Sequence, residues 1–332
     1  MPCPYGGSQP LEDMVTNVPL TLAIRDYDYI APLATGDVAI EGVDLTLIRS
    51  FDALVRVAND PAVNGGEASF SRYVQRLAGG DRSLVGLPAF VMREFRHRCF
   101  FVRRDSGLAD VVDLAGKRVG TDQWPASGNT WSRALLRERG VAIENISWLV
   151  GPVNPTSQPP PATDVYPDKV QPALPGRPLR EILLDGEIDA LMCPWPPDGF
   201  YELDSQIARM YPDYRAAERD YYRRTGIFPA HHLVVLKREL VERQPQLVRA
   251  VYDALVEARE RSERTHQVLA ETSPWLLADL EEQAVLMGPD FRPYGLRENY
   301  QMVAAFCDEQ YAQRLIQGPI TPEEVFGDFM RM

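Results

Sequence analysis

The stretch Thr225-Gly-Ile-Phe-Pro-Ala-His-His-Leu-Val-Val-Leu-Lys237 sets two histidines where a turn becomes a strand. Its glycine and proline are typical of a turn, and the apolar run Leu233 to Leu236 predicts a buried strand. In open α/β folds, ligands bind beyond the ends of strands. His231 and His232 are therefore candidates for a ligand site, and a pair of core or surface histidines is the alternative interpretation.

Length and composition narrow the class of protein. The chain has 332 residues, of which 45% are hydrophobic and 25% charged, the balance of a soluble globular protein with room for two domains. Its 47 acidic and 35 basic residues give a net charge of −12. This charge argues against nucleic acid or an anionic membrane as the main partner, so an anionic ligand requires a local basic pocket.

The cysteines and the N-terminus indicate a cytoplasmic protein. The four cysteines are far apart, without CxxC or CxxH spacing, so neither a structural zinc site nor a disulfide framework is predicted. Residues 1–18 contain no apolar run typical of a secretory signal and are predicted to be a flexible tail. No apolar stretch reaches about 18 residues, which leaves no transmembrane candidate.

The first part of the chain predicts a strand, a second strand and a helix. Leu20 to Ile24 alternates as a strand does and ends in a polar cluster that contains Asp26 and Tyr29. Further on, paired glycines precede Glu67, and Ser69 or Ser71 is expected to cap a helix. A helix start with free N–H groups suits an anion, although capping alone explains the serine.

Two later stretches carry more polar candidates. Arg96 and His97 lead into the apolar run Cys99 to Val102, which predicts a strand. Cations at the start of a strand favour a carboxylate ligand. The alternative is that they lie on a solvated edge strand. A second helix start is expected before the helix 131–139. It offers the aromatic ring of Trp124 and three cap residues, Ser127, Asn129 and Thr130.

The remaining segments are predicted to be mainly structural. Residues 151–178 hold nine of the 28 prolines and are interpreted as an extended surface loop without chemistry. The strand expected before Cys193 ends in a rigid corner around Trp195. After residue 237 the pattern is helical, and Thr321-Pro-Glu-Glu324 predicts a capping box.

Taken in order, several motifs resemble one enzyme family, the 4,5-dihydroxyphthalate decarboxylases, on the fold of type II periplasmic solute-binding proteins. These motifs span roughly residues 20 to 325. They are Asp26-Tyr-Asp28, Ile40-Glu-Gly-Val-Asp-Leu45, Glu67 with Ser69 and Ser71, Phe95-Arg-His97, Asp185-Gly-Glu-Ile-Asp-Ala-Leu191, Tyr211-Pro-Asp-Tyr-Arg215, Arg223-Arg-Thr-Gly-Ile-Phe-Pro229, His232-Leu-Val-Val235 and Met287-Gly-Pro-Asp-Phe-Arg-Pro-Tyr-Gly295.

The resemblance implies an α/β protein of two lobes with a ligand cleft between them. Lobe one is expected at 19–107 plus 230–332, and lobe two at 108–229. It also implies decarboxylation of a hydroxylated aromatic acid without an organic cofactor, and a homo-oligomer is compatible with it. His97 and His232 are the expected acid/base pair, and Glu67 is a second acid or a partner of the phenol. The expected substrate-binding residues are Arg96, Asp26, Tyr29, Ser69, Trp124, Ser127, Asn129, Thr130, Trp195, Phe228 and His231.

The chain also departs from the family pattern. Tyr29 stands where the family usually has a histidine, Ala230 precedes His231 where a bulkier residue is usual, and the proline-rich loop is an addition. Two alternatives stay open. One is a solute-binding protein without catalysis, since a fold does not determine a function. The other is a divalent metal on one of the histidines with Glu67 or Asp26, which no HxxxH spacing supports.

Overall fold

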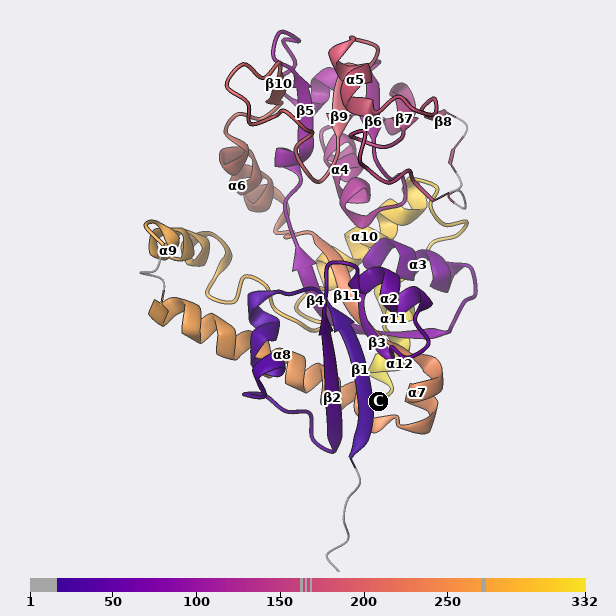
Figure 1. Ribbon diagram of the computed structural model, residues 1–332, viewed down its shortest axis with the longest axis vertical. Helices are drawn as coiled ribbons and strands as arrows, with labels where there is room; N and C mark the ends of the chain where they lie inside the picture. The colour runs from indigo at the N-terminus through magenta and orange to yellow at the C-terminus, as the bar shows by residue number, and fades with distance from the viewer. Residues whose placement is uncertain (1–16, 162–163, 165, 168, 270–272) are drawn as a thin grey trace, which may run out of the picture.

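The computed structural model describes residues 17–161, 164, 166–167, 169–269 and 273–332. Its strands form two sheets that lie one beyond the other along the long axis of the molecule (Figure 1). The tail predicted for residues 1–18 lies outside the described residues up to residue 16. At residue 18 the prediction is wrong, because β1 already begins at Val18.

The first sheet has the order β2-β1-β3-β11-β4. Strands β1 and β2, and β1 and β3, are parallel, whereas β11 runs antiparallel between β3 and β4. The bounds are β1 (Val18–Ile24), β2 (Val43–Arg49), β3 (Gly65–Ser69), β4 (Leu84–Arg93) and β11 (Ala230–Lys237). The strand predicted from Leu233 to Leu236 is thus confirmed, and it is central because its apolar residues are buried on both faces.

The second sheet has the order β10-β5-β9-β6-β7-β8. Its four strands β9, β6, β7 and β8 are parallel, and β5 and β10 extend it antiparallel. The bounds are β5 (Phe100–Arg103), β6 (Arg118–Thr121), β7 (Ser147–Val150), β8 (Val170–Pro172), β9 (Ala190–Met192) and β10 (Ile207–Arg209). The loop predicted at 151–178 therefore contains a short edge strand, β8, which sequence periodicity did not indicate.

The chain crosses from the first sheet to the second earlier than expected. Strand β5 pairs with β9 and β10, so the crossing lies in residues 94–99 and the predicted limit at 107 is wrong. A strand pattern does not say which sheet a strand will join. The return precedes β11, and the backbone N–H of Glu94 donates to the carbonyl of Pro229 at 3.0 Å, so the two connecting segments lie side by side (Figure 1). The division into lobes on either side of these segments stays a prediction.

Helices cover both sheets and fill the space between them (Figure 1). The bounds are α1 (Ala31–Thr35), α2 (Ala53–Asn59), α3 (Phe70–Ala78), α4 (Ser127–Glu138), α5 (Leu179–Leu184), α6 (Tyr214–Thr225), α7 (Arg238–Arg243), α8 (Gln246–Leu269), α9 (Leu276–Met287), α10 (Tyr300–Ala312), α11 (Pro322–Val325) and α12 (Gly327–Met330). Ser69 caps α3 and Thr321 forms a capping box on α11, as predicted. Among helices of the described ranges, none is long and apolar enough to cross a membrane.

Aromatic packing fixes the helices that face the cleft. The ring of Phe306 in α10 lies 4.4 Å from Phe70 at the start of α3 and 5.2 Å from Trp131 in α4, measured between centroids. The Trp131 indole also donates to the carbonyl of Ala230 at 2.8 Å, which ties α4 to β11. These buried contacts hold the starts of α3 and α4 next to the end of β3.

Candidate active site

Glu67 lies in β3 and is the buried carboxylate of the site, with no exposed surface. Two glycines precede it. A Cβ on Gly66, whose φ is +138°, would lie 1.9 Å from the carbonyl oxygen of Ala23, so glycine is needed for β3 to approach β1 this closely. The glycine pair that predicted a loop therefore belongs to a strand, and it positions Glu67 in the middle of β3.

Three donors hold the Glu67 carboxylate. His232 Nδ1 lies 2.5 Å and the Tyr27 hydroxyl 2.8 Å from Oε1, and the Arg25 backbone N–H lies 2.9 Å from Oε2. Burial raises the pKa of Glu67, but the hydrogen bond and charge of His232 and the donors of Arg25 outweigh it and leave the pKa below its ordinary value. The carboxylate form of Glu67 is thus favoured, and its expected role as a second acid or a partner of the phenol stays a prediction.

The ionised carboxylate determines the tautomer of His232. A carboxylate can only accept, so the Nδ1 atom of His232 must carry the proton of this hydrogen bond. The Nε2 atom has no recorded hydrogen bond among the described residues, and the side chain remains 13% exposed. His232 also stands opposite Ser69 in the ladder between β11 and β3. An oriented imidazole with one free nitrogen can pass a proton to or from a bound molecule.

Two stacked tyrosines support the pair from the end of β1. The rings of Tyr27 and Tyr29 lie 5.2 Å apart and nearly parallel. Tyr29 donates its hydroxyl to the carbonyl of Val91, and the Arg292 guanidinium lies 4.5 Å above its ring. The hydroxyl of Tyr29 is thus engaged by the protein, and we interpret this residue as a support for Tyr27.

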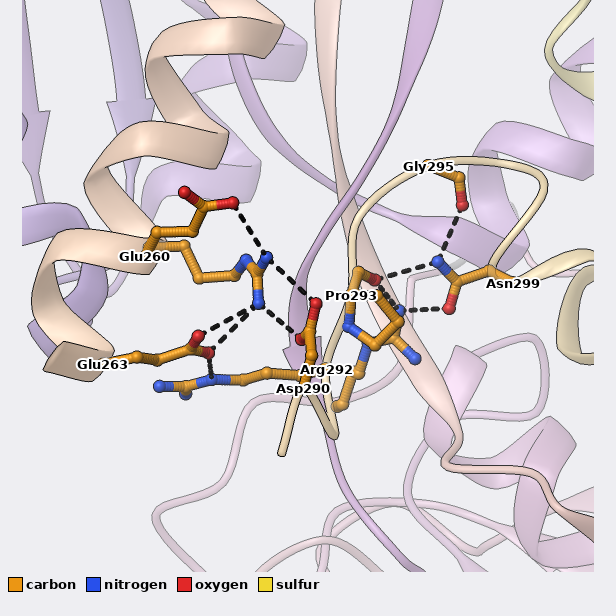
Figure 2. Close-up of polar contacts among 9 residues, drawn as sticks. Glu260, Glu263, Asp290, Arg292, Pro293, Gly295 and Asn299 are labelled. Carbon is orange, nitrogen blue, oxygen red and sulfur yellow. Dashed lines mark hydrogen bonds and ion pairs between the residues drawn. The ribbon is translucent and has the colours of Figure 1, made fainter. Parts of the chain in front are cut away.

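The loop of residues 288–299 brings Arg292 to this stack. Figure 2 shows how α8 holds one side of the loop. Glu263 of α8 accepts from Arg292 Nε of the loop at 2.8 Å, and Arg259 Nη1 of α8 donates to Asp290 of the loop at 2.7 Å. On the other side, the Asn299 amide donates to the carbonyls of the loop at Pro293 and Gly295 (Figure 2). The motif around residues 287–295 therefore acts on the site through Arg292 and the tyrosines.

His97 does not join this group. It lies in a short 3-10 turn, His97–Cys99, between the rings of Tyr211 and Tyr221, each 5.5 Å away. Burial, and then the charge of Arg224, lowers its pKa to about 4. Its Nδ1 has no partner among the described residues. The turn before β5 directs this ring at α6, and no contact between His97 and His232 is recorded among the described residues, so their pairing stays a prediction.

Arg96 lies in the segment that crosses between the sheets, and His231 lies at the start of β11. The Arg96 guanidinium is 2% exposed and lies against Gly128 in the first turn of α4. Its Nη1 donates to Glu94 at 3.0 Å. His231 is buried, with Nε2 3.1 Å from the Glu94 carbonyl, and burial followed by the charge of Arg96 lowers its pKa well below the ordinary value. His231 is thus a neutral ring that lies against Glu94 in the crossing segment.

The polar side chains at the start of α4 are used by the protein itself. Ser127 Oγ lies 3.0 Å from Ser69 Oγ and accepts from the Ser71 N–H at 2.9 Å. Asn129 donates to Asp122 at 2.7 Å, and Thr130 donates to the Ala126 carbonyl. These serines join α3 to α4. None of the predicted residues caps α4, whose N-cap is Ala126 without a side-chain bond.

The aromatic candidates separate. Trp124 is 1% exposed, under Arg133 and against Trp148, so it packs as a core residue, and its assignment to a substrate slot stays a prediction. Trp195 is 56% exposed beyond β9, and Phe228 packs 4.8 Å from Phe95. Both assignments stay predictions. Asp26 is exposed and pairs with Arg49 at 2.8 Å.

The sequence analysis missed Tyr27 and Arg25. Both belong to the polar cluster after β1, in which only Asp26 and Tyr29 were selected. Because β1 and β3 are parallel neighbours, residues that follow β1 reach the end of β3, and this pairing would have singled them out.

In the described part of the chain, no three His, Cys, Asp or Glu side chains come together as metal ligands. A surface hollow lined by Arg118, Trp148 and Lys169 lies at the starts of β6 and β7. It contains none of the cleft residues, and ligands of parallel sheets bind at the opposite ends of the strands, so we assign the site to Glu67 and His232.

Two curated proteins of known activity resemble this chain. No family model matches the chain. It is 31% identical to a 4,5-dihydroxyphthalate decarboxylase of Comamonas testosteroni over 324 residues, which covers 94% of this chain and 97% of the relative. It is 30% identical to one of Pseudomonas putida over 209 residues, 61% of this chain and 81% of the relative.

A solved structure shows the fold. A conserved Candida albicans gene product, described as having the generic periplasmic binding protein fold, aligns with a TM-score of 0.50 at 12% identity, over 94% of this chain and 95% of the other. The two-lobed α/β fold class predicted from the sequence is thus confirmed. From these relatives, the chain belongs to the 4,5-dihydroxyphthalate decarboxylase family.

Proposed function

We propose that the chain releases CO2 from a hydroxylated aromatic carboxylic acid of the 4,5-dihydroxyphthalate kind, by acid/base catalysis and without an organic cofactor. The observation that supports this most directly is the Glu67–His232 pair, which leaves one imidazole nitrogen free where β3 ends and β11 begins. The relatives' names supply the class of substrate.

The substrate itself provides the electrons for this reaction. A hydroxyl group ortho or para to the carboxylate donates electron density to the ring carbon that bears the carboxylate. A proton adds to that carbon and forms a C–H bond. The bond to the carboxylate then breaks, its electron pair restores the aromatic ring, and CO2 leaves. The net change is one proton consumed per CO2 released.

In this proposal His232 carries the proton to the ring. Its Nε2–H donates to the carbon, and the imidazolium that precedes transfer is stabilised by the Glu67 carboxylate on the other nitrogen. Glu67 and Tyr27 are positioning residues, because their contacts end on His232 or on one another. Solvent returns the proton to His232 after CO2 has left.

The test is a panel of hydroxybenzoates and hydroxyphthalates incubated with metal-stripped protein in D2O. We expect CO2 from a hydroxyphthalate and one deuterium at the vacated ring carbon. His232→Gln should abolish most of this activity, whereas His266→Gln, a matched change of an α8 histidine paired with Asp28, should not. Tight binding without CO2 release would instead favour a solute-binding protein.

A further inference from the structure

Arg96 has an unused donor in a buried position. Its Nε donates to Ser132 at 3.3 Å and its Nη1 to Glu94 at 3.0 Å. Its Nη2 has no partner among the described residues, although the side chain is only 2% exposed. A buried cationic N–H without an acceptor is unfavourable, so this atom is expected to meet an anion when the site is filled.

The first turn of α4 faces the same point. This helix is 12 residues long, and its first backbone hydrogen bond is donated by Thr130, to Ala126. In the described part of the chain, no hydrogen bond is recorded for the N–H groups of residues 127, 128 and 129. Three free N–H groups at a helix start attract negative charge.

Gly128 lets the arginine and the helix start come together. A Cβ at this position would lie 2.7 Å from Arg96 Cζ and 2.8 Å from Nη2. Any larger residue would have to displace the guanidinium. The glycine therefore lets the Arg96 guanidinium, with its free Nη2, lie directly against the first turn of α4.

We infer that Arg96 and the first turn of α4 bind a carboxylate of the substrate that does not leave. This inference rests on the proposed function, because it assigns part of the same substrate. We call Arg96 and the first turn of α4 the anchor. Ser69 joins the anchor to His232, because it stands opposite His232 in the sheet and contacts Ser127. An aromatic ring with two adjacent carboxylates can place one on the anchor and present the other beside His232.

Electrostatics favours binding of the carboxylate that stays, and not of the one that leaves, by Arg96. A carboxylate that departs as CO2 loses its charge, and a buried cation bound to it would oppose that loss. A carboxylate that stays keeps its charge throughout, so binding it does not raise the barrier. Glu94 pairs with both Arg96 and Arg98, which leaves the three side chains with one net positive charge for the ligand.

The anchor also predicts that each ring loses only one CO2. After the first loss the product keeps its anchored carboxylate, and only a C–H bond faces His232. A monocarboxylate such as 3,4-dihydroxybenzoate should therefore bind in this orientation and inhibit, without losing CO2.

The experiment measures binding of phthalate, an inert dicarboxylate, by calorimetry. Gly128→Ala should weaken it about a hundredfold, the scale for a lost contact to a buried charge, by displacing Arg96. Alanine favours the helix, so folding of α4 is not at risk. Gly318→Ala is the matched control, because its Cβ would meet nothing within 4 Å, and it should change binding less than about twofold. Arg96→Lys keeps the charge without the planar fork and should weaken binding about tenfold.

Two results would overturn the inference. One is unchanged phthalate binding in both Gly128→Ala and Arg96→Lys. The other is release of CO2 from 3,4-dihydroxybenzoate as fast as from 4,5-dihydroxyphthalate. Failure of the proposed function looks different: phthalate would bind through the anchor, and no member of the panel would release CO2.

Discussion

His97 and His232 begin as the same kind of residue and end in opposite environments. His232 has a carboxylate partner, a fixed tautomer and a free nitrogen that is partly exposed. His97 lies between Tyr211 and Tyr221 with an unpartnered Nδ1, and burial lowers its pKa to about 4. An imidazole can work as an acid near neutral pH only if it can hold a proton there, so we expect no such role for His97.

The difference comes from neighbours that are distant in sequence. Strand β11 puts His232 beside Glu67, which is 165 positions away, whereas the turn before β5 directs His97 at α6. A polar residue next to the end of a strand is therefore only a candidate for proton transfer. Its partner decides whether it can transfer a proton.

The largest expected effect is that of His232→Gln. Glutamine keeps a polar side chain but cannot transfer a proton, so kcat should fall about a hundredfold or more. Single-turnover CO2 release measures the chemical step. A variant that retains near-full activity would assign the proton transfer to another residue.

Glu67→Gln should reduce kcat about thirtyfold. The amide can no longer stabilise an imidazolium, and it also permits the wrong tautomer of His232. A second measurement is the free energy of unfolding as a function of pH. Since the pKa of Glu67 is lowered in the folded protein, its contribution to stability is present above its unfolded pKa and lost as pH falls through the folded pKa. This acid-side loss should be absent from the variant, and an unchanged profile would contradict the role of Glu67.

Tyr27→Phe should reduce kcat by about fivefold, a smaller effect, because it removes one of three donors to Glu67 and leaves the stack on Tyr29 intact. KM should change little if Tyr27 positions His232 and does not touch substrate. A large rise in KM with unchanged kcat would instead make Tyr27 a binding residue.

His97→Phe should change kcat by less than about twofold, in contrast to His232→Gln. Its effect should appear in stability. With a folded pKa of about 4, His97 binds fewer protons in the folded than in the unfolded chain between pH 6.5 and 4, so the free energy of unfolding falls as pH drops through this window. The contribution is at most about 3 kcal/mol and should be missing from the variant in denaturant titrations at pH 7 and pH 5. Loss of activity at neutral pH would restore His97 to the mechanism.

Local patterns predicted the elements better than their partners. The strand through Leu236, the Ser69 cap and the capping box at Thr321 are all confirmed, because alternation and capping depend on residues a few positions apart. The crossing at residues 94–99 and the strand β8 were missed. Sheet membership depends on long-range pairing, which one strand's sequence does not encode.

The site divides in the same way. The sequence by itself determined which side chains could do the chemistry: a carboxylate after a glycine pair, histidines at the start of a strand, and an arginine before the next one. Only the tertiary structure decided their roles. Glu67 acts as a fixed acceptor because three donors from distant segments meet it, and Trp124 is a core residue because Arg133 and Trp148 cover it. Proton affinity depends on burial and on neighbouring charges, and both arise only when distant parts of the chain pack together.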